Sequence, residues 1–156
     1  MKSIITSILA LTVIFVSLSA FADDSIMVHN AWVRSAPPNA KVLAAYMTIM
    51  NHSEKPIALT AISSRQFGKI EMHKTEMHGD SMKMIYQKQL NIPAQGSLIL
   101  KPGGFHLMLM KPISLPQVGE SVDMDLYFNN GQTLHIKMPV KTKSDKGHVM
   151  GNSHNH

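Results

Sequence analysis

The sequence predicts an all-β protein with one domain, arranged as a β-sandwich or barrel. Nine strand-length runs rich in β-branched and apolar residues follow one another between residues 25 and 140. Clusters of Gly, Pro, Asn and Asp separate these runs at short intervals. Short strands at such spacing are typical of sandwiches and barrels, and no segment of this range shows a convincing long-helix pattern.

Each expected strand lies between two turn signals. The run 43–51 is the weakest prediction, because Ala44, Ala45 and its Met residues also suit a helix. Asn130-Gly131 predicts a hairpin that joins 124–128 to 134–138, and alternation places His135 on the solvent side of its strand. The expected strands are 25–34, 43–51, 57–63, 68–77, 82–90, 97–101, 105–110, 121–128 and 133–140.

Both ends of the chain differ from this central domain. Residues 1–22 have the layout of a cleaved secretory signal peptide: Lys2, an apolar run, then Ala20-Phe21-Ala22. The apolar run is shorter than the roughly 20 residues that a spanning helix needs, which favours cleavage after Ala22 over an uncleaved membrane anchor. No later segment is apolar enough to span a bilayer, so stable membrane insertion after cleavage is not expected. Residues 141–156 are polar and predict a flexible tail. We therefore expect a domain at 23–140 in a periplasmic protein.

The composition narrows the classes of function. There is no Cys, which excludes thiolate metal sites, disulfide chemistry and blue-copper electron transfer. The net charge is +5, yet no stripe of Lys and Arg with interleaved aromatic residues predicts nucleic-acid binding. The chain does contain 9 His and 13 Met residues. This enrichment in two types of soft or borderline metal ligand needs an explanation.

One group of these residues lies in a predicted hairpin around Gly79-Asp80. If the loop is centred there, paired residues have numbers that sum to 159, so that Thr75 lies opposite Met84. Alternation then places His73 and Met84 on one face as diagonal neighbours, about 7–8 Å apart at the backbone. Met77 and Met82 fall on that same face, and Met72 and His78 lie close by in sequence, so all four stay further candidate ligands.

A second group lies in the strand that follows Pro102-Gly103, a dipeptide suited to a type II turn. His106, Met108 and Met110 share one face of this strand, whereas Leu107 and Leu109 mark the other face as core. Met110 is therefore a further candidate ligand. If this strand approaches the hairpin, the two groups together form a compact site with four ligands. Glu71 falls on the His73 face and Glu76 on the opposite one, but neither predicts a general base.

The ligand types favour Cu(I). Thioether sulfur is soft and neutral and binds Cu(I) well, whereas structural zinc sites use Cys and His. Two His and two Met leave the bound ion with its single positive charge. Four protein ligands leave no open position for a substrate, which favours carriage over catalysis. Met47, Met50, Met124 and Met138 are instead expected to fill gaps in the core.

The sequence resembles the periplasmic copper chaperones known as PCu(A)C proteins. Their motif is His, ten residues, Met, twenty-one residues, His, one residue and Met, and His73, Met84, His106 and Met108 fit every spacing. The stretches 31–34, 71–73 and 101–109 are also similar to recurrent stretches of that family. The resemblance covers nearly all of residues 25–140.

The resemblance implies a cupredoxin-like β-sandwich with Greek-key connections and a metal site at His73, Met84, His106 and Met108. It also implies delivery of Cu(I) during assembly of the copper centre of cytochrome c oxidase, to an oxidase subunit or to a thioredoxin-like assembly factor. Some members have a His- and Met-rich extension that binds further copper. In this chain a second ion, Cu(II), would bind at the tail residues His148, Met150, His154 and His156.

Three other hypotheses remain at this point. A copper-buffering or resistance protein without a dedicated recipient would also use the tail as a scavenger. A metal enzyme would need an open coordination position and a nearby base, which the sequence does not offer, so we expect no enzymatic activity. A β-sandwich adhesion module would leave the His and Met enrichment unexplained.

Overall fold

The computed structural model describes residues 25–142, and this part of the chain contains ten strands and no helix. The expected signal peptide and almost all of the expected tail lie outside the described residues. The strands are β1 (Ile26–Arg34), β2 (Val42–Asn51), β3 (Ile57–Ser63), β4 (Phe67–His78), β5 (Ser81–Gln87), β6 (Leu90–Ile92), β7 (Gly96–Leu100), β8 (Phe105–Pro112), β9 (Ser121–Phe128) and β10 (Thr133–Lys141). The predicted all-β class is confirmed.

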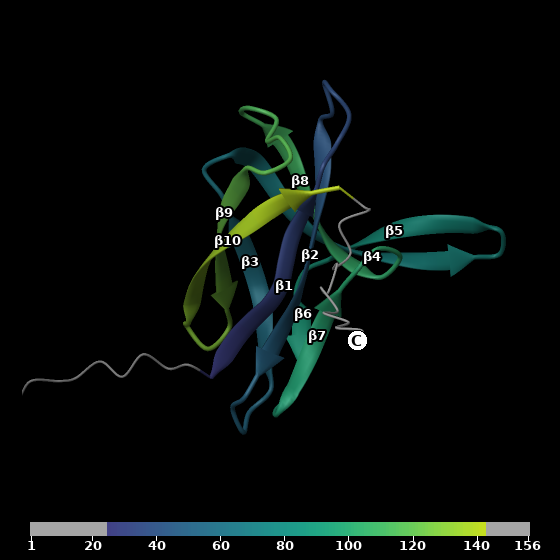
Figure 1. Ribbon diagram of the computed structural model, residues 1–156. Coiled ribbons are helices and arrows are strands. Elements are labelled where there is room, and N and C mark those ends of the chain that lie inside the picture. Colours follow the sequence, from purple (N-terminus) through teal and green to yellow (C-terminus); the bar gives the residue numbers. More distant parts are fainter. Residues whose placement is uncertain (1–24, 143–156) are drawn as a thin grey trace, which may run out of the picture.

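The strands are hydrogen-bonded in the order β5-β4-β8-β7-β2-β1-β10-β9-β3-β6 (Figure 1). A parallel pairing between β1 and β10 joins β5, β4, β8, β7 and β2 on one side to β9, β3 and β6 on the other. Buried side chains from both groups of strands pack into a single core. Strand β6 is at one end of this order, yet it also contacts β2, which lies near the middle of the order. The continuous sheet therefore encloses its core between two groups of strands.

The core residues follow the expected period-two alternation. On β8, Leu107 and Leu109 are fully buried, and on β4 Met72 is buried beside them. Met47, Met124 and Met138 are also buried, as predicted for core methionines, whereas Met50 is only partly buried. Because successive side chains on a strand point to opposite faces, the neighbouring His73, His106 and Met108 are directed away from this core.

Strand predictions and structure differ most at residues 82–92. One strand was expected over 82–90, but β5 ends at Gln87 and β6 begins at Leu90. The break arises because β5 pairs with β4 whereas β6 pairs with β3, on the other side of the core. The uncertain run 43–51 is a strand, and β10 extends to Lys141, one residue beyond the expected end of the domain.

The β4–β5 hairpin projects from the body of the protein (Figure 1). Its loop is Gly79-Asp80, with Gly79 at a φ of 60°, in the left-handed region that glycine tolerates. The pairs His78–Ser81, Met77–Met82 and Thr75–Met84 all form. The predicted register of this hairpin is therefore confirmed.

Candidate metal centre

The candidate site lies on the outer face of three adjacent strands, β5, β4 and β8. His73 on β4 is directly opposite His106 on β8, and Glu71 is directly opposite Met108. Met84 on β5 pairs with Thr75, two residues along β4 from His73. Residues that pair directly in an antiparallel ladder point to the same face. All four candidate ligands therefore lie on one face, across three neighbouring strands.

The two imidazole rings are close enough for one metal ion to bond to both. Their centroids are 6.0 Å apart, with an interplanar angle of 44°. Metal–nitrogen bonds are about 2 Å long, so an ion between the rings can reach one nitrogen of each. Tyr86 packs edge-on against His73 with a centroid distance of 6.1 Å, which restricts the orientation of that ring.

Hydrogen bonds select the free nitrogen of each ring. Nε2 of His73 donates to Oε2 of Glu71 at 2.8 Å, because a carboxylate can only accept. Nδ1 of His106 donates to the carbonyl of Gly104 at 3.0 Å. The remaining nitrogens, Nδ1 of His73 and Nε2 of His106, are buried and have no hydrogen-bond partner among the described residues. An unpartnered buried nitrogen is costly, and a bound metal ion would remove that cost.

The turn before β8 positions His106. Gly103 has a φ of 79°, and the Gly104 amide donates to the Lys101 carbonyl at 3.0 Å, as in the predicted type II turn. The Gly104 carbonyl accepts from the Thr75 amide at 3.1 Å as well as from His106. The turn is thereby fastened to β4, and it fixes both the position and the tautomer of His106.

Glu71 has a second partner beside His73. Nζ of Lys69 lies 2.5 Å from Oε1 of Glu71, and this hydrogen bond, followed by the one from His73, lowers the pKa of Glu71. The carboxylate is therefore ionised at neutral pH and can hold the Nε2 proton of His73. Alternation assigned Glu71 to the correct face, but sequence reasoning missed its role as the hydrogen-bond partner of His73.

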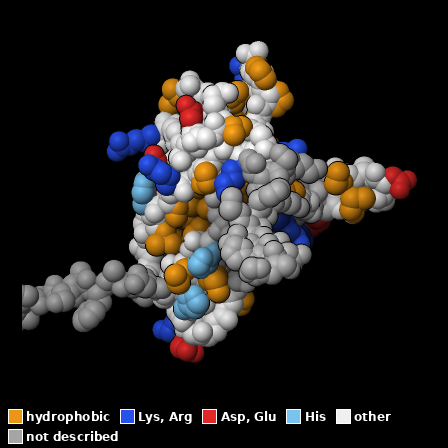
Figure 2. Space-filling model, in the orientation of Figure 1, with side chains coloured by type: hydrophobic (Ala, Val, Ile, Leu, Met, Phe, Trp, Pro, Cys, Tyr) orange, Lys and Arg blue, Asp and Glu red, His pale blue; other side chains and the backbone are white. Residues whose placement is uncertain are grey.

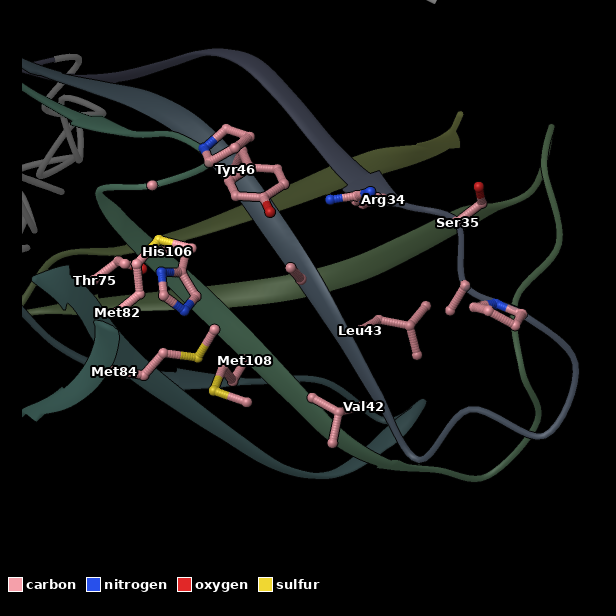
Figure 3. Close-up of a pocket in the computed structure, with 15 residues that line it drawn as sticks. Arg34, Ser35, Val42, Leu43, Tyr46, Thr75, Met82, Met84, His106 and Met108 are labelled. Carbon is pink, nitrogen blue, oxygen red and sulfur yellow. The ribbon is translucent and has the colours of Figure 1, made fainter. Parts of the chain in front are cut away.

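A pocket of about 530 Å³ opens beside the site. His106, Met84, Met108 and Met82 lie together at one end of it (Figure 3). Its lining includes Arg34, Val42, Leu43, Tyr46, Thr75 and Pro102. His73 is not part of this lining, and its side chain is only 13% exposed. The structure thus places three of the four candidate ligands at the pocket, whereas His73 lies outside its lining, opposite His106 on the neighbouring strand.

The remaining His and Met candidates lie elsewhere. His135 is on β10, with its side chain 66% exposed and its Nδ1 2.9 Å from Oδ1 of Asp125, so the prediction of a surface residue is confirmed. Met72 is in the core and His78 is on the face of the hairpin opposite to His73. Met110 pairs with Lys69 and lies two residues beyond Met108 on β8, farther from His73 and His106. The tail residues His148, Met150, His154 and His156 lie outside the described residues.

The ligand chemistry depends on the thioethers. Among residues 25–142, no three His, Cys, Asp or Glu side chains come together as a set of metal ligands. Met84 and Met108 lie on the same face as the two His residues and bring the set of candidate ligands to four. Such a set is suited to a soft monovalent ion such as Cu(I) and poorly suited to hard ions.

Fold and site together define an all-β domain that presents a His/Met cluster on one outer sheet face. Residues 26–140 match the model of a family described as "LpqE-like: Putative lipoprotein LpqE-like". The chain belongs to this LpqE-like family.

Known proteins are similar over most of the chain. "Putative lipoprotein Lxx21020" of Leifsonia xyli subsp. xyli (strain CTCB07) is 29% identical over 119 residues, which are 76% of this chain and 70% of that protein. The solution structure of CuI-DR1885 from Deinococcus radiodurans is 34% identical, covers 81% of this chain and 85% of that one, and has a TM-score of 0.61.

The copper-bound PCuAC domain from PmoF2 has a TM-score of 0.65 and is 21% identical, with 76% of this chain and 93% of that chain covered. At this identity the similarity concerns the fold, which is cupredoxin-like as expected. The resemblance to PCu(A)C proteins is thus confirmed for the architecture. In the described part of the chain, no helix is long and apolar enough to cross a membrane.

Proposed function

We propose that this protein binds one Cu(I) ion through Nδ1 of His73, Nε2 of His106 and the sulfur atoms of Met84 and Met108, and carries it to a recipient protein. The observation that carries this proposal is the pair of buried imidazole nitrogens without partners, on a sheet face that also bears two thioethers. The relatives described as CuI-DR1885 and copper-bound PmoF2 domain support the same metal.

Carriage is favoured over catalysis by the coordination. Four protein ligands satisfy Cu(I) and leave no position for a substrate or an activated water. Release is favoured by the exposure of one ligand, because the Met84 side chain is 61% exposed and an incoming ligand can replace it. We therefore propose a copper carrier and not an enzyme.

X-ray absorption at the copper edge tests the coordination. The purified protein, loaded with one equivalent of Cu(I) under anaerobic conditions, should show two nitrogen and two sulfur scatterers. Met84→Leu should remove one sulfur and leave both nitrogens. A first shell of nitrogen and oxygen alone would contradict the proposal.

The recipient is proposed to be a cytochrome c oxidase subunit or a thioredoxin-like assembly factor in the periplasm. The resemblance to PCu(A)C proteins and the signal-like residues 1–22 support this destination. Deletion of the protein should lower the copper content and the activity of the oxidase, and added copper should restore both. A deletion that reduces copper tolerance and leaves the oxidase unchanged would favour the alternative, a copper-buffering protein.

The tail is proposed to hold a second copper ion, Cu(II), at His148, His154 and His156 with Met150 nearby. In support, β10 ends at Lys141 beside Arg34, which lines the pocket, and the Ser35 amide donates to the Lys141 carbonyl at 2.9 Å. The end of β10 thus lies beside the pocket that the proposed site adjoins. Replacing the three tail His residues by Ala in the full chain should abolish Cu(II) binding and leave Cu(I) binding unchanged.

A further inference from the structure

The β4–β5 hairpin exposes three methionines that the proposed copper site does not fully explain. Met77, Met82 and Met84 are 66%, 70% and 61% exposed. Figure 2 shows hydrophobic side chains along this projecting hairpin and acidic side chains at its tip. Large apolar side chains of this kind are usually placed in the core, so an exposed set on one element calls for a function.

The register brings the three thioethers together. Met77 is directly opposite Met82, and Met84 is the next residue on β5 that points to the same face. Directly opposed Cβ atoms are about 5 Å apart and diagonal ones about 7–8 Å apart. Met has three rotatable side-chain bonds, so the three sulfur atoms can converge on one soft ion.

The three exposed methionines adjoin the ligands of the proposed copper site. Met82 and Met84 line the same pocket as His106 and Met108, and in Figure 3 all four side chains gather at one end of that pocket. Met77 is farther out, one pair from the hairpin loop. The thioethers therefore form a row from the exposed tip of the hairpin to the imidazoles. Met84 lies between the two groups and can serve as a ligand in either.

We propose that Met77, Met82 and Met84 form a second, weaker Cu(I) site, through which copper enters and leaves the inner site. This inference rests on the function proposed above. On entry, the bonds from copper to the sulfur atoms of Met77 and Met82 break, while bonds to His73, His106 and Met108 form and Met84 stays bound. Every ligand is neutral, so copper remains Cu(I) and no electron or proton is transferred.

The outer site is weaker for two physical reasons. It has three sulfur donors and no nitrogen donor, and its side chains are exposed, so binding must order flexible Met rotamers. It contributes little to the equilibrium affinity and mainly offers a path for exchange. Copper in solvent cannot contact the free nitrogens of His73 and His106 directly, because these atoms are buried, so the exposed thioethers offer it the first ligands.

Copper-transfer kinetics test the path. The full chain and the double variant Met77→Leu/Met82→Leu are loaded with one equivalent of Cu(I), and transfer to a chromophoric Cu(I) chelator is followed by stopped flow. The variant should keep the equilibrium affinity within about twofold and transfer copper at least about tenfold more slowly. Met27→Leu, a substitution of an exposed Met on β1, is the matched control and should change neither.

Two kinetic results would overturn the inference. An unchanged transfer rate in the double variant would show that Met77 and Met82 lie off the path. A large loss of equilibrium affinity would make one of them an inner ligand. If the unsubstituted protein binds no tight equivalent, the proposed carrier function itself fails, and this result is distinct from either of the other two.

Methyl NMR tests the site directly. The Met Cε signals are followed during addition of one and then two equivalents of Cu(I). The protein used is the full chain with Met150→Leu and with Ala at His148, His154 and His156, so that the tail cannot compete for copper. The first equivalent should shift Met84 and Met108 most. The second should shift Met77 and Met82, the two thioethers of the outer site that stay free once the inner ion holds Met84, and should leave Met27 unchanged. A second equivalent that leaves Met77 and Met82 unshifted would overturn the outer site.

Discussion

Glu71 accepts a hydrogen bond of 2.8 Å from Nε2 of His73, and this contact leaves Nδ1 as the only nitrogen of that ring available to a ligand. His106 has the opposite arrangement, since its Nδ1 donates to Gly104 and its Nε2 is free. The two rings therefore present different nitrogens toward the same face. The predictions below follow from this arrangement and from the exposure of the sulfur ligands.

The two histidines should have opposite tautomers in the metal-free protein. At neutral pH, His73 should carry its proton on Nε2 and His106 on Nδ1, because their acceptors cannot donate. Long-range ¹H–¹⁵N correlation spectra of the imidazoles distinguish the two tautomers. Finding the same tautomer in both rings would mean that at least one of these hydrogen bonds does not govern its ring.

Glu71→Gln should weaken Cu(I) binding by about 10- to 100-fold, the usual cost of removing a partner that orients a metal ligand. The amide is a poorer acceptor and loses the ion pair with Lys69. Glu76→Gln is the matched control, because Glu76 also pairs with a lysine, Lys74, but lies on the opposite face. A competition titration measures both, and equal affinities in the two variants would refute the positioning role of Glu71.

Met84→Leu should leave the free energy of unfolding within about 0.5 kcal/mol of the unsubstituted value, because the side chain is largely exposed. Met124→Ala should cost about 2–5 kcal/mol, since Met124 is 1% exposed and its truncation leaves a cavity. Urea denaturation of the metal-free proteins separates the two. A large destabilisation by Met84→Leu would reassign that residue to packing.

His135→Ala should not change the affinity for Cu(I). His135 lies on β10 and is held by Asp125, with Asp123 3.7 Å away. It is also the histidine of a strand that takes no part in the β5-β4-β8 face. The same competition titration provides the check, and a drop of tenfold or more would bring His135 into the site.

Local sequence patterns predicted much of this structure. Alternation predicted which side of β8 faces the core, because Leu107 and Leu109 share one side while His106, Met108 and Met110 share the other. The Gly79-Asp80 loop predicted the register of the hairpin, since a two-residue loop fixes every pair that follows it. These are interactions between residues close in sequence, which a sequence pattern can specify.

Such local patterns could not predict which strands pair when they are far apart in the sequence. The contact between His73 and His106 depends on the pairing of β4 with β8, and the break between β5 and β6 depends on their different partner strands. Nothing within either strand specifies its partner. The hydrogen bond that His73 donates to Glu71 was missed for a different reason: residues two apart on a strand share a face, but their rotamers decide whether they touch.

The central claim is a single Cu(I) site made by two His and two Met, and an anaerobic competition titration against a chromophoric Cu(I) chelator tests it most directly. The purified protein should bind one tight equivalent, and Met84→Leu and Met108→Leu should each weaken it by at least about tenfold, while His135→Ala should not. Binding of that equivalent with unchanged affinity in both Met variants, or its absence from the unsubstituted protein, would contradict the claim.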